Sequence, residues 1–144
     1  MNWKMISENF SRAWDEFVAE KYPNVDKHVK YVEPSMSKVE FLIKYDLNLL
    51  NLRDLYDYFD SKKIVVNPDY YFDDEYGNGF IYTIKHSFCK GDPPFVEDYD
   101  FNSLFKERRE AEIAAFTIAF EIRNEQLVKQ ALARQPCLII CHSS

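Results

Sequence analysis

The feature that most constrains the fold is an apolar pattern near the end of the sequence, from Ser103 to about Arg134. Its spacing predicts a long helix over residues 103–134, capped by Asn102 or Ser103 and ended by Pro136. The polar positions gather within about one third of the helical circle, which leaves an apolar arc of roughly 200°. A helix covered on one side needs only ~100°. We therefore expect this helix to be covered on two sides, one of them by a sheet.

The second cover of this helix is either the N-terminal helix of the same chain or another protein chain. Small residues on the helix, such as Ala115 and Ala119, would let that second element approach closely. The N-terminal helix is the simpler explanation because it belongs to the same molecule. If a partner or a second copy of the chain covers this side instead, the candidate interface residues are Ile113, Phe116, Phe120 and Leu127.

The clearest β pattern lies at the centre of the sequence, over residues 63–87. Two runs rich in β-branched and aromatic residues, 64–72 and 80–84, flank a polar turn that contains Asn78-Gly79. This arrangement is typical of an antiparallel hairpin. Pro68 lies within the first run, and a proline in a strand indicates an edge position or a bulge.

The sequence before the hairpin predicts helices. Apolar residues at helical spacing indicate a first helix over Ser7–Lys21, with Ser7 as its cap, ended by Tyr22-Pro23. Residues 26–34 read as a loop or a short edge strand. Ser37 and Glu40 have the form of a capping box, after which either a short helix or a strand is open.

A further helix is expected from Asn48 onward, directly before the hairpin. Its apolar stripe consists of Leu52, Leu55, Tyr56 and Phe59, while Asp54, Asp57 and Asp60 are expected on the solvent side.

Together these patterns predict an α+β fold in which a small antiparallel sheet is packed by helices. Either one helix covers each face of the sheet, or two helices share one face. We expect one domain over residues 1–144, made of a helical portion (1–50), a helix–hairpin–helix core (51–134) and a tail (135–144). The segment from Gly91 to Asn102 reads as a loop, and the apolar tail residues Cys137–Cys141 read as a last short strand or an unpaired tail.

Two segments of this core carry a resemblance. Residues 108–122, RREAEIAAFTIAFEI, follow residues 55–64, LYDYFDSKKI, across the hairpin. Over about residues 50–127 the chain resembles small uncharacterised proteins of Bacteroides-type bacteria and of their phages or mobile elements. The resemblance implies a helix–hairpin–helix unit, and it implies no activity and no functional residues.

Composition and charge narrow the function classes. Hydrophobic residues make up 47% and aromatic residues 17% of the chain, a composition typical of a folded globule. The net charge is −6, and residues 46–100 hold twelve acidic and five basic residues, a local charge of −7. This charge argues against a nucleic-acid or anionic-membrane partner. Three cysteines and an N-terminus without an apolar leader predict a cytoplasmic protein with reduced thiols.

No common catalytic or cofactor motif occurs in the sequence, which favours a non-catalytic protein without a cofactor. His86 and Cys89 with Cys137, Cys141 and His142 have metal-like spacing, but ordinary thiols and imidazoles are the simpler reading. The carboxylate clusters at 73–75 and 98–100 do not match a calcium loop. The hairpin aromatics Tyr70, Tyr71, Phe72, Phe80 and Tyr82 are explained most simply by core packing and a half-exposed sheet face.

The sequence therefore favours an interaction or accessory protein that acts through contacts with a protein partner or with itself. One alternative is an acidic mimic that inhibits a nucleic-acid-binding protein, suggested by the charge of the central segment. A second alternative is a metal-dependent hydrolase that uses the central carboxylates.

Overall fold

The computed structural model describes residues 1–72, 75, 77–86, 96–99 and 104–134, with the side chains of 96–99 left out. The elements in chain order are α1 (Trp3–Asn9), α2 (Ser11–Lys21), α3 (Val25–Val32), α4 (Lys38–Tyr45), the 3-10 helix η1 (Leu47–Leu49), α5 (Leu52–Ser61), β1 (Ile64–Tyr71), β2 (Gly79–His86), β3 (Val96–Tyr99) and α6 (Arg108–Ala133). The α+β class and the long C-terminal helix predicted from the sequence are confirmed.

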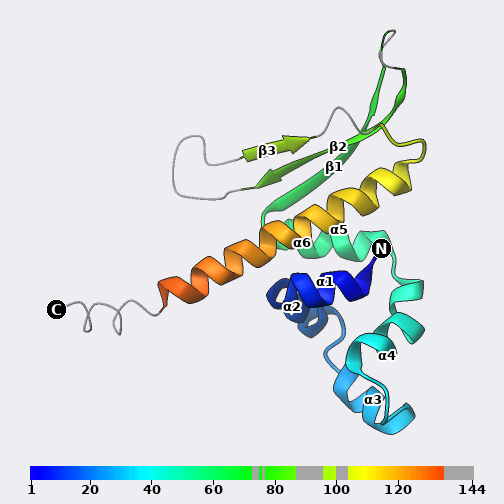
Figure 1. The fold of residues 1–144 in the computed structure, drawn as a ribbon, viewed down its shortest axis with the longest axis vertical. Coiled ribbons are helices and arrows are strands. Elements are labelled where there is room, and N and C mark those ends of the chain that lie inside the picture. Colours follow the sequence, from blue (N-terminus) through cyan, green and yellow to red (C-terminus); the bar gives the residue numbers. More distant parts are fainter. Residues whose placement is uncertain (73–74, 76, 87–95, 100–103, 135–144) are drawn as a thin grey trace, which may run out of the picture.

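The three strands form an antiparallel sheet in the order β1-β2-β3, which places β1 at an edge and confirms the edge position predicted for Pro68. The hairpin register pairs Val66 with Ile84, and both side chains are buried. Val65 and Lys85 form the neighbouring pair on the opposite face, and both are exposed. Since strand side chains alternate between faces, the helices cover one face of this hairpin. Figure 1 shows them on one side of the sheet.

The long helix α6 lies between the sheet and the N-terminal helices (Figure 1). It contacts β1 and β2 on one side and α2 on another. The two-sided cover expected from its apolar arc is therefore present. The second cover comes from the same chain, as the simpler of the two explanations predicted.

The core between these layers is rich in aromatic rings. Phe120 of α6 lies 5.5 Å from Phe17 of α2 and 4.9 Å from Phe59 of α5, measured between ring centroids and with the rings edge to face. Phe59 also stacks on Phe116 at 5.8 Å. Such pairs add to the stabilisation that burial of the rings provides. The aromatic contacts thus join α2, α5 and α6 into one packed unit.

The first helix differs from its prediction, because the chain breaks at Phe10 into α1 and α2. Asn2 caps α1, and the Ser7 hydroxyl donates to the carbonyl oxygen of Lys4 instead of capping a helix. The start of α2 has no cap from its own neighbours. Its cap comes from α6, where the Asn124 Oδ1 accepts hydrogen bonds from the backbone N–H groups of Arg12 (3.0 Å) and Ala13 (3.2 Å). The end at Tyr22 agrees with the prediction.

The reading of residues 26–34 as a loop or strand is wrong, because Val25–Val32 forms α3. The alternation that suggested a strand is short, whereas Val25 and Val29 recur at helical spacing and turn inward. The following segment is α4. Ser37 caps it through a hydrogen bond from the N–H of Glu40, as half of the predicted capping box requires.

The helix before the hairpin, α5, begins at Leu52 with Asn51 as its cap, later than the expected start near Asn48. Residues Leu47–Leu49 form η1 instead. Asp54, Asp57 and Asp60 are exposed, as the apolar stripe predicted.

The start of the long helix is also corrected. It begins at Arg108 after Glu107, so neither Asn102 nor Ser103 caps it. Phe105, which lies within residues 103–134 that were expected to be helical, instead pairs with Phe80 of β2. Within the segment expected to be a loop, Val96–Tyr99 forms β3. The apolar tail lies outside the described residues. No helix in the described part of the chain is long and apolar enough to span a bilayer.

Candidate functional site

The predicted interface residues on α6 divide into two groups. Phe116 and Phe120 are fully buried in the core of the chain, so their side chains have no surface to offer to a partner. Ile113 and Leu127 are half-buried and keep some exposed surface. Whether these two contact a partner stays a prediction.

A group of polar side chains joins α2, α5 and α6 at the edge of the core. Arg123 of α6 donates to both carboxylate oxygens of Glu16, from Nε at 2.8 Å and from Nη2 at 2.9 Å. The Tyr58 hydroxyl of α5 donates to the same carboxylate at 2.8 Å. A two-pronged arginine–carboxylate contact is strong and directional. This group therefore orients the three helices.

These contacts shift the pKa values of the group. Partial burial raises the pKa of Glu16, but the hydrogen bonds from Arg123 and Tyr58 outweigh burial and leave it below its ordinary value. Burial, followed by the hydrogen bond to Glu16, raises the pKa of Tyr58. The hydrogen bond to Glu16 raises the pKa of Arg123. The shifts of Glu16 and Arg123 favour the charged carboxylate and guanidinium, and the shift of Tyr58 keeps its hydroxyl protonated as a donor, so the group behaves as a structural tie.

The distal end of the β1–β2 hairpin carries a cluster of aromatic side chains, which we call the aromatic tip and define as Tyr70, Phe72 and Phe80. Tyr70 and Phe72 are exposed, and Phe80 is half-buried. The Tyr70 ring lies 4.6 Å from Phe72 and 4.9 Å from Phe80, in both cases edge to face. Phe72 is 74% exposed and Tyr70 is 41% exposed. This end of the hairpin projects away from the helices, at the opposite end of the molecule from α3 (Figure 1).

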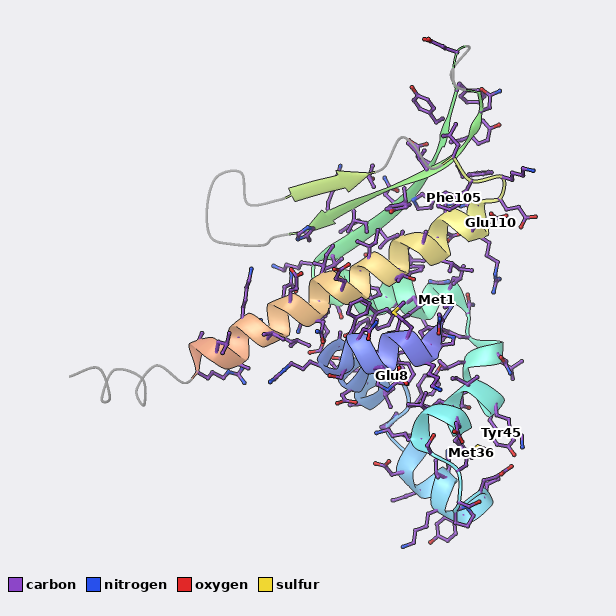
Figure 2. The ribbon with its side chains drawn as sticks, in the orientation of Figure 1. Met1, Glu8, Met36, Tyr45, Phe105 and Glu110 are labelled. Carbon is purple, nitrogen blue, oxygen red and sulfur yellow. The ribbon has the colours of Figure 1, made fainter. Side chains whose placement is uncertain are left out.

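The aromatic tip is anchored where β2 meets the segment before α6. Phe80 and Phe105 exchange two backbone hydrogen bonds, of 2.8 and 2.9 Å. Next to this bridge, a Cβ atom added to Gly79 would lie 2.9 Å from the Cβ of Leu104 and 3.1 Å from the carbonyl oxygen of Phe105. A glycine is needed for this close approach. Figure 2 labels Phe105 beside the start of α6.

The sequence interpretation of the hairpin aromatics combined core packing with a half-exposed sheet face, and the set contains both buried and exposed members. Tyr82 is buried, as core packing predicts. Tyr70 and Phe72 instead lie beyond the part of the sheet that α6 covers, and they remain exposed. The available signal was their position directly beside the polar turn, since residues next to a projecting turn have few neighbours to cover them.

The residues with metal-like spacing cannot be placed together. His86 is buried at the end of β2, while Cys89, Cys137, Cys141 and His142 lie outside the described residues. Asp73, Asp74 and Asp100 also lie outside them, as does the side chain of Asp98. The described residues contain no group of three or more His, Cys, Asp or Glu side chains able to hold a metal ion.

Comparison of the chain with family models, curated proteins and solved structures finds no match. Among the described residues, the aromatic tip is the most exposed apolar cluster joined by ring contacts.

Proposed function

We propose that this protein is a non-catalytic interaction protein that binds a protein partner through the aromatic tip. The observation that carries the proposal is the exposure of Phe72 while Tyr70 packs between it and Phe80. A Tyr70 ring that packs on both Phe72 and Phe80 at the end of a projecting arm forms a preordered apolar surface. Aromatic side chains of this kind contribute a large share of the binding free energy at protein interfaces.

The rings of the aromatic tip are already held in place in the free protein, and this supports a role in binding a partner. A partner that binds a mobile side chain must fix its rotamers, at a cost of about 0.5–1.5 kcal/mol for each. At the aromatic tip, edge-to-face contacts and the bridge from Phe80 to Phe105 already restrict the rings. Binding at the aromatic tip therefore requires less additional ordering of side chains, because the fold already restricts the rings.

The charge beside the aromatic tip indicates the chemistry of the partner. Asp69 and Glu75 are exposed near the rings, and the Asp69 carboxylate accepts a hydrogen bond from the N–H of Tyr70. A matching partner surface would have an apolar pocket for the rings and basic residues at its rim. Charge complementarity at a rim mainly speeds association and selects among partners.

The test is a double variant, Tyr70→Ser with Phe72→Ser, compared with the wild type and with Tyr31→Ser. Tyr31 is a suitable control because it is an aromatic residue, 83% exposed, on α3. Each protein is crosslinked in its native cells, purified, and its bound proteins are quantified by mass spectrometry. Light scattering at several concentrations detects a second copy of the chain as the partner.

We expect the double variant to lose a partner that the wild type and the control retain. With the purified partner, its Kd should rise about 30-fold or more, as expected for loss of an aromatic hot spot. The circular dichroism melting curve should remain unchanged, since both substituted side chains are exposed. If the folded double variant keeps every partner and the same mass in solution, the aromatic tip is not the binding surface.

A further inference from the structure

Two hollows flank the C-terminal half of α6, and the first of them lies at the start of β1, the opposite end of that strand from the aromatic tip. The first, of about 400 Å³, lies between α6 and the end of α5 and is lined by Lys62, Lys63, Arg123, Gln126, Lys129, Gln130 and Ala133. The second, of about 420 Å³, lies between α6 and α2 and is lined by Arg12, Asp15, Glu16, Arg123, Leu127, Gln130, Ala131 and Arg134. Arg123 and Gln130 border both, so the two hollows adjoin across α6.

The charge of these hollows is opposite to that of the chain. Six basic residues line them and only two acidic ones do, although the whole chain carries a net charge of −6. The hollow beside α5 is lined by four basic residues and no acidic residue. Concentrated charge of one sign in a concave surface raises the local concentration of ligands of the other sign.

The basic residues have two different roles. Arg123 is bound by Glu16, and Lys62 is hydrogen-bonded to Glu20, so both belong to the tie that joins the helices. Lys63 and Lys129 are exposed at the hollow beside α5, and Arg12 and Arg134 are exposed at the hollow beside α2. A ligand would therefore meet the exposed set first.

Lys63 has an unusual backbone. Its φ is 60°, the one positive φ at a non-glycine position among the described residues. It follows the last turn of α5, and its N–H donates to the carbonyl oxygen of Asp60 at 3.0 Å. Glycine is the residue that fits this left-handed position at a helix end without strain. The chain instead places an ammonium group there, at the rim of a basic hollow. A strained backbone position occupied by a residue other than glycine suggests a use for its side chain.

We propose that the two hollows form one binding surface for an extended acidic segment of a partner protein. From Arg123 to Arg134, α6 rises about 16 Å, the length of roughly five residues of extended chain. Along this length Leu127 and Ala131 provide apolar surface between the basic residues. Gln126 and Gln130 add side-chain amides to the lining of the hollow beside α5.

The local chemistry favours a peptide over a nucleic acid. No aromatic residue lines either hollow to stack on a base. This surface is independent of the aromatic tip.

The test measures binding of fluorescein-labelled hexaglutamate to the full chain by fluorescence anisotropy, at about 20 and 200 mM salt. Lys63→Gly removes the ammonium group and also relieves the backbone strain. We expect it to weaken binding about two- to fivefold at the lower salt. The same substitution should raise the thermal unfolding midpoint by a few degrees. Lys63→Arg should restore binding, and Lys129→Gln should weaken it to a similar extent.

Lys27→Gln on α3 is the matched control, because it removes one exposed positive charge far from the hollows in the sequence and in the fold (Figure 1). It should leave the affinity unchanged. Equal weakening by the control would show that total charge alone determines binding, and full affinity of Lys63→Gly would also overturn the proposal. Tighter binding of a hexathymidylate strand than of hexaglutamate would assign the surface to nucleic acid instead.

Discussion

The two halves of α6 belong to one continuous helix but are held by different forces. The first half, Arg108 to Ile122, contains every buried residue of the helix: Ala111, Ala115, Phe116, Ala119, Phe120 and Ile122. The second half, Arg123 to Ala133, contains none, and Leu132 there is 61% exposed. Its contacts to the body include the hydrogen bonds of Arg123 and Asn124 to α2. The first half is packed as core, and the second half is positioned by directional polar contacts.

The stability of the fold therefore depends mainly on the first half of α6, whereas the second half keeps surface available for binding. The free energy gained from apolar burial is proportional to the buried area, and a packed core tolerates little change in the shape of its side chains. Polar contacts at the edge of the core set the orientation of the helix while its remaining surface stays accessible. The second half of α6 can therefore carry the basic hollows without loss of the core.

The largest expected effect comes from a substitution in the first half. Phe120→Ala should lower the free energy of unfolding by about 3–5 kcal/mol, because it leaves a cavity among four other aromatic rings. Leu132→Ala in the second half should change it by less than about 0.5 kcal/mol. Urea unfolding followed by circular dichroism measures both. Similar losses for the two variants would remove the distinction between the halves.

The next effect tests the tie at the start of the second half. Arg123→Ala should lower the free energy of unfolding by about 2 kcal/mol, because it leaves the partly buried Glu16 carboxylate without its main partner. In a double-mutant cycle with Glu16→Gln, the second substitution should add little once the first is made. Additive losses in urea unfolding would show that the two side chains do not act as a pair.

A smaller effect is expected at the neighbouring residue. Asn124→Ala removes the cap of α2 and should lower the free energy of unfolding by about 1 kcal/mol, the usual value for a lost helix cap. Amide hydrogen exchange should become faster at Arg12 and Ala13. Glu125→Ala, at an exposed position of the same turn, is the control. Unchanged exchange at these two amides would contradict the role of Asn124.

The smallest effect is a dependence on pH. The pKa of Glu16 in the folded protein lies below its ordinary value of 4.5, so the folded state binds fewer protons than the unfolded state in this range. The stabilisation of the fold by the ionised Glu16 carboxylate is present above pH 4.5 and is lost as the pH falls through the lowered pKa. The stability difference between the wild type and Glu16→Gln should therefore shrink on acidification. A difference that is constant with pH would argue against the ionised pair.

The regular elements with clear periodicity could be predicted from the sequence. The hairpin, the apolar stripe of α5 and the two-sided cover of α6 all follow from the spacing of apolar side chains, which depends only on the geometry of helices and strands. The binding surfaces could not be predicted in this way. The candidate interface named Phe116 and Phe120 because they are apolar, but an apolar residue at helical spacing is equally suited to a core.

What the sequence by itself determined is the order and kind of the main elements, because periodicity is a local property. The tertiary structure decided where those elements begin and what they expose. The break at Phe10 is the clearest example, since the cap that starts α2 is supplied by Asn124, more than a hundred residues away. The tertiary structure also decided how much of α6 is covered, whereas its apolar arc predicted only that the helix is covered on two sides. The sheet and α2 cover its first half closely, and burial ends at Ile122 because few neighbours remain beyond it.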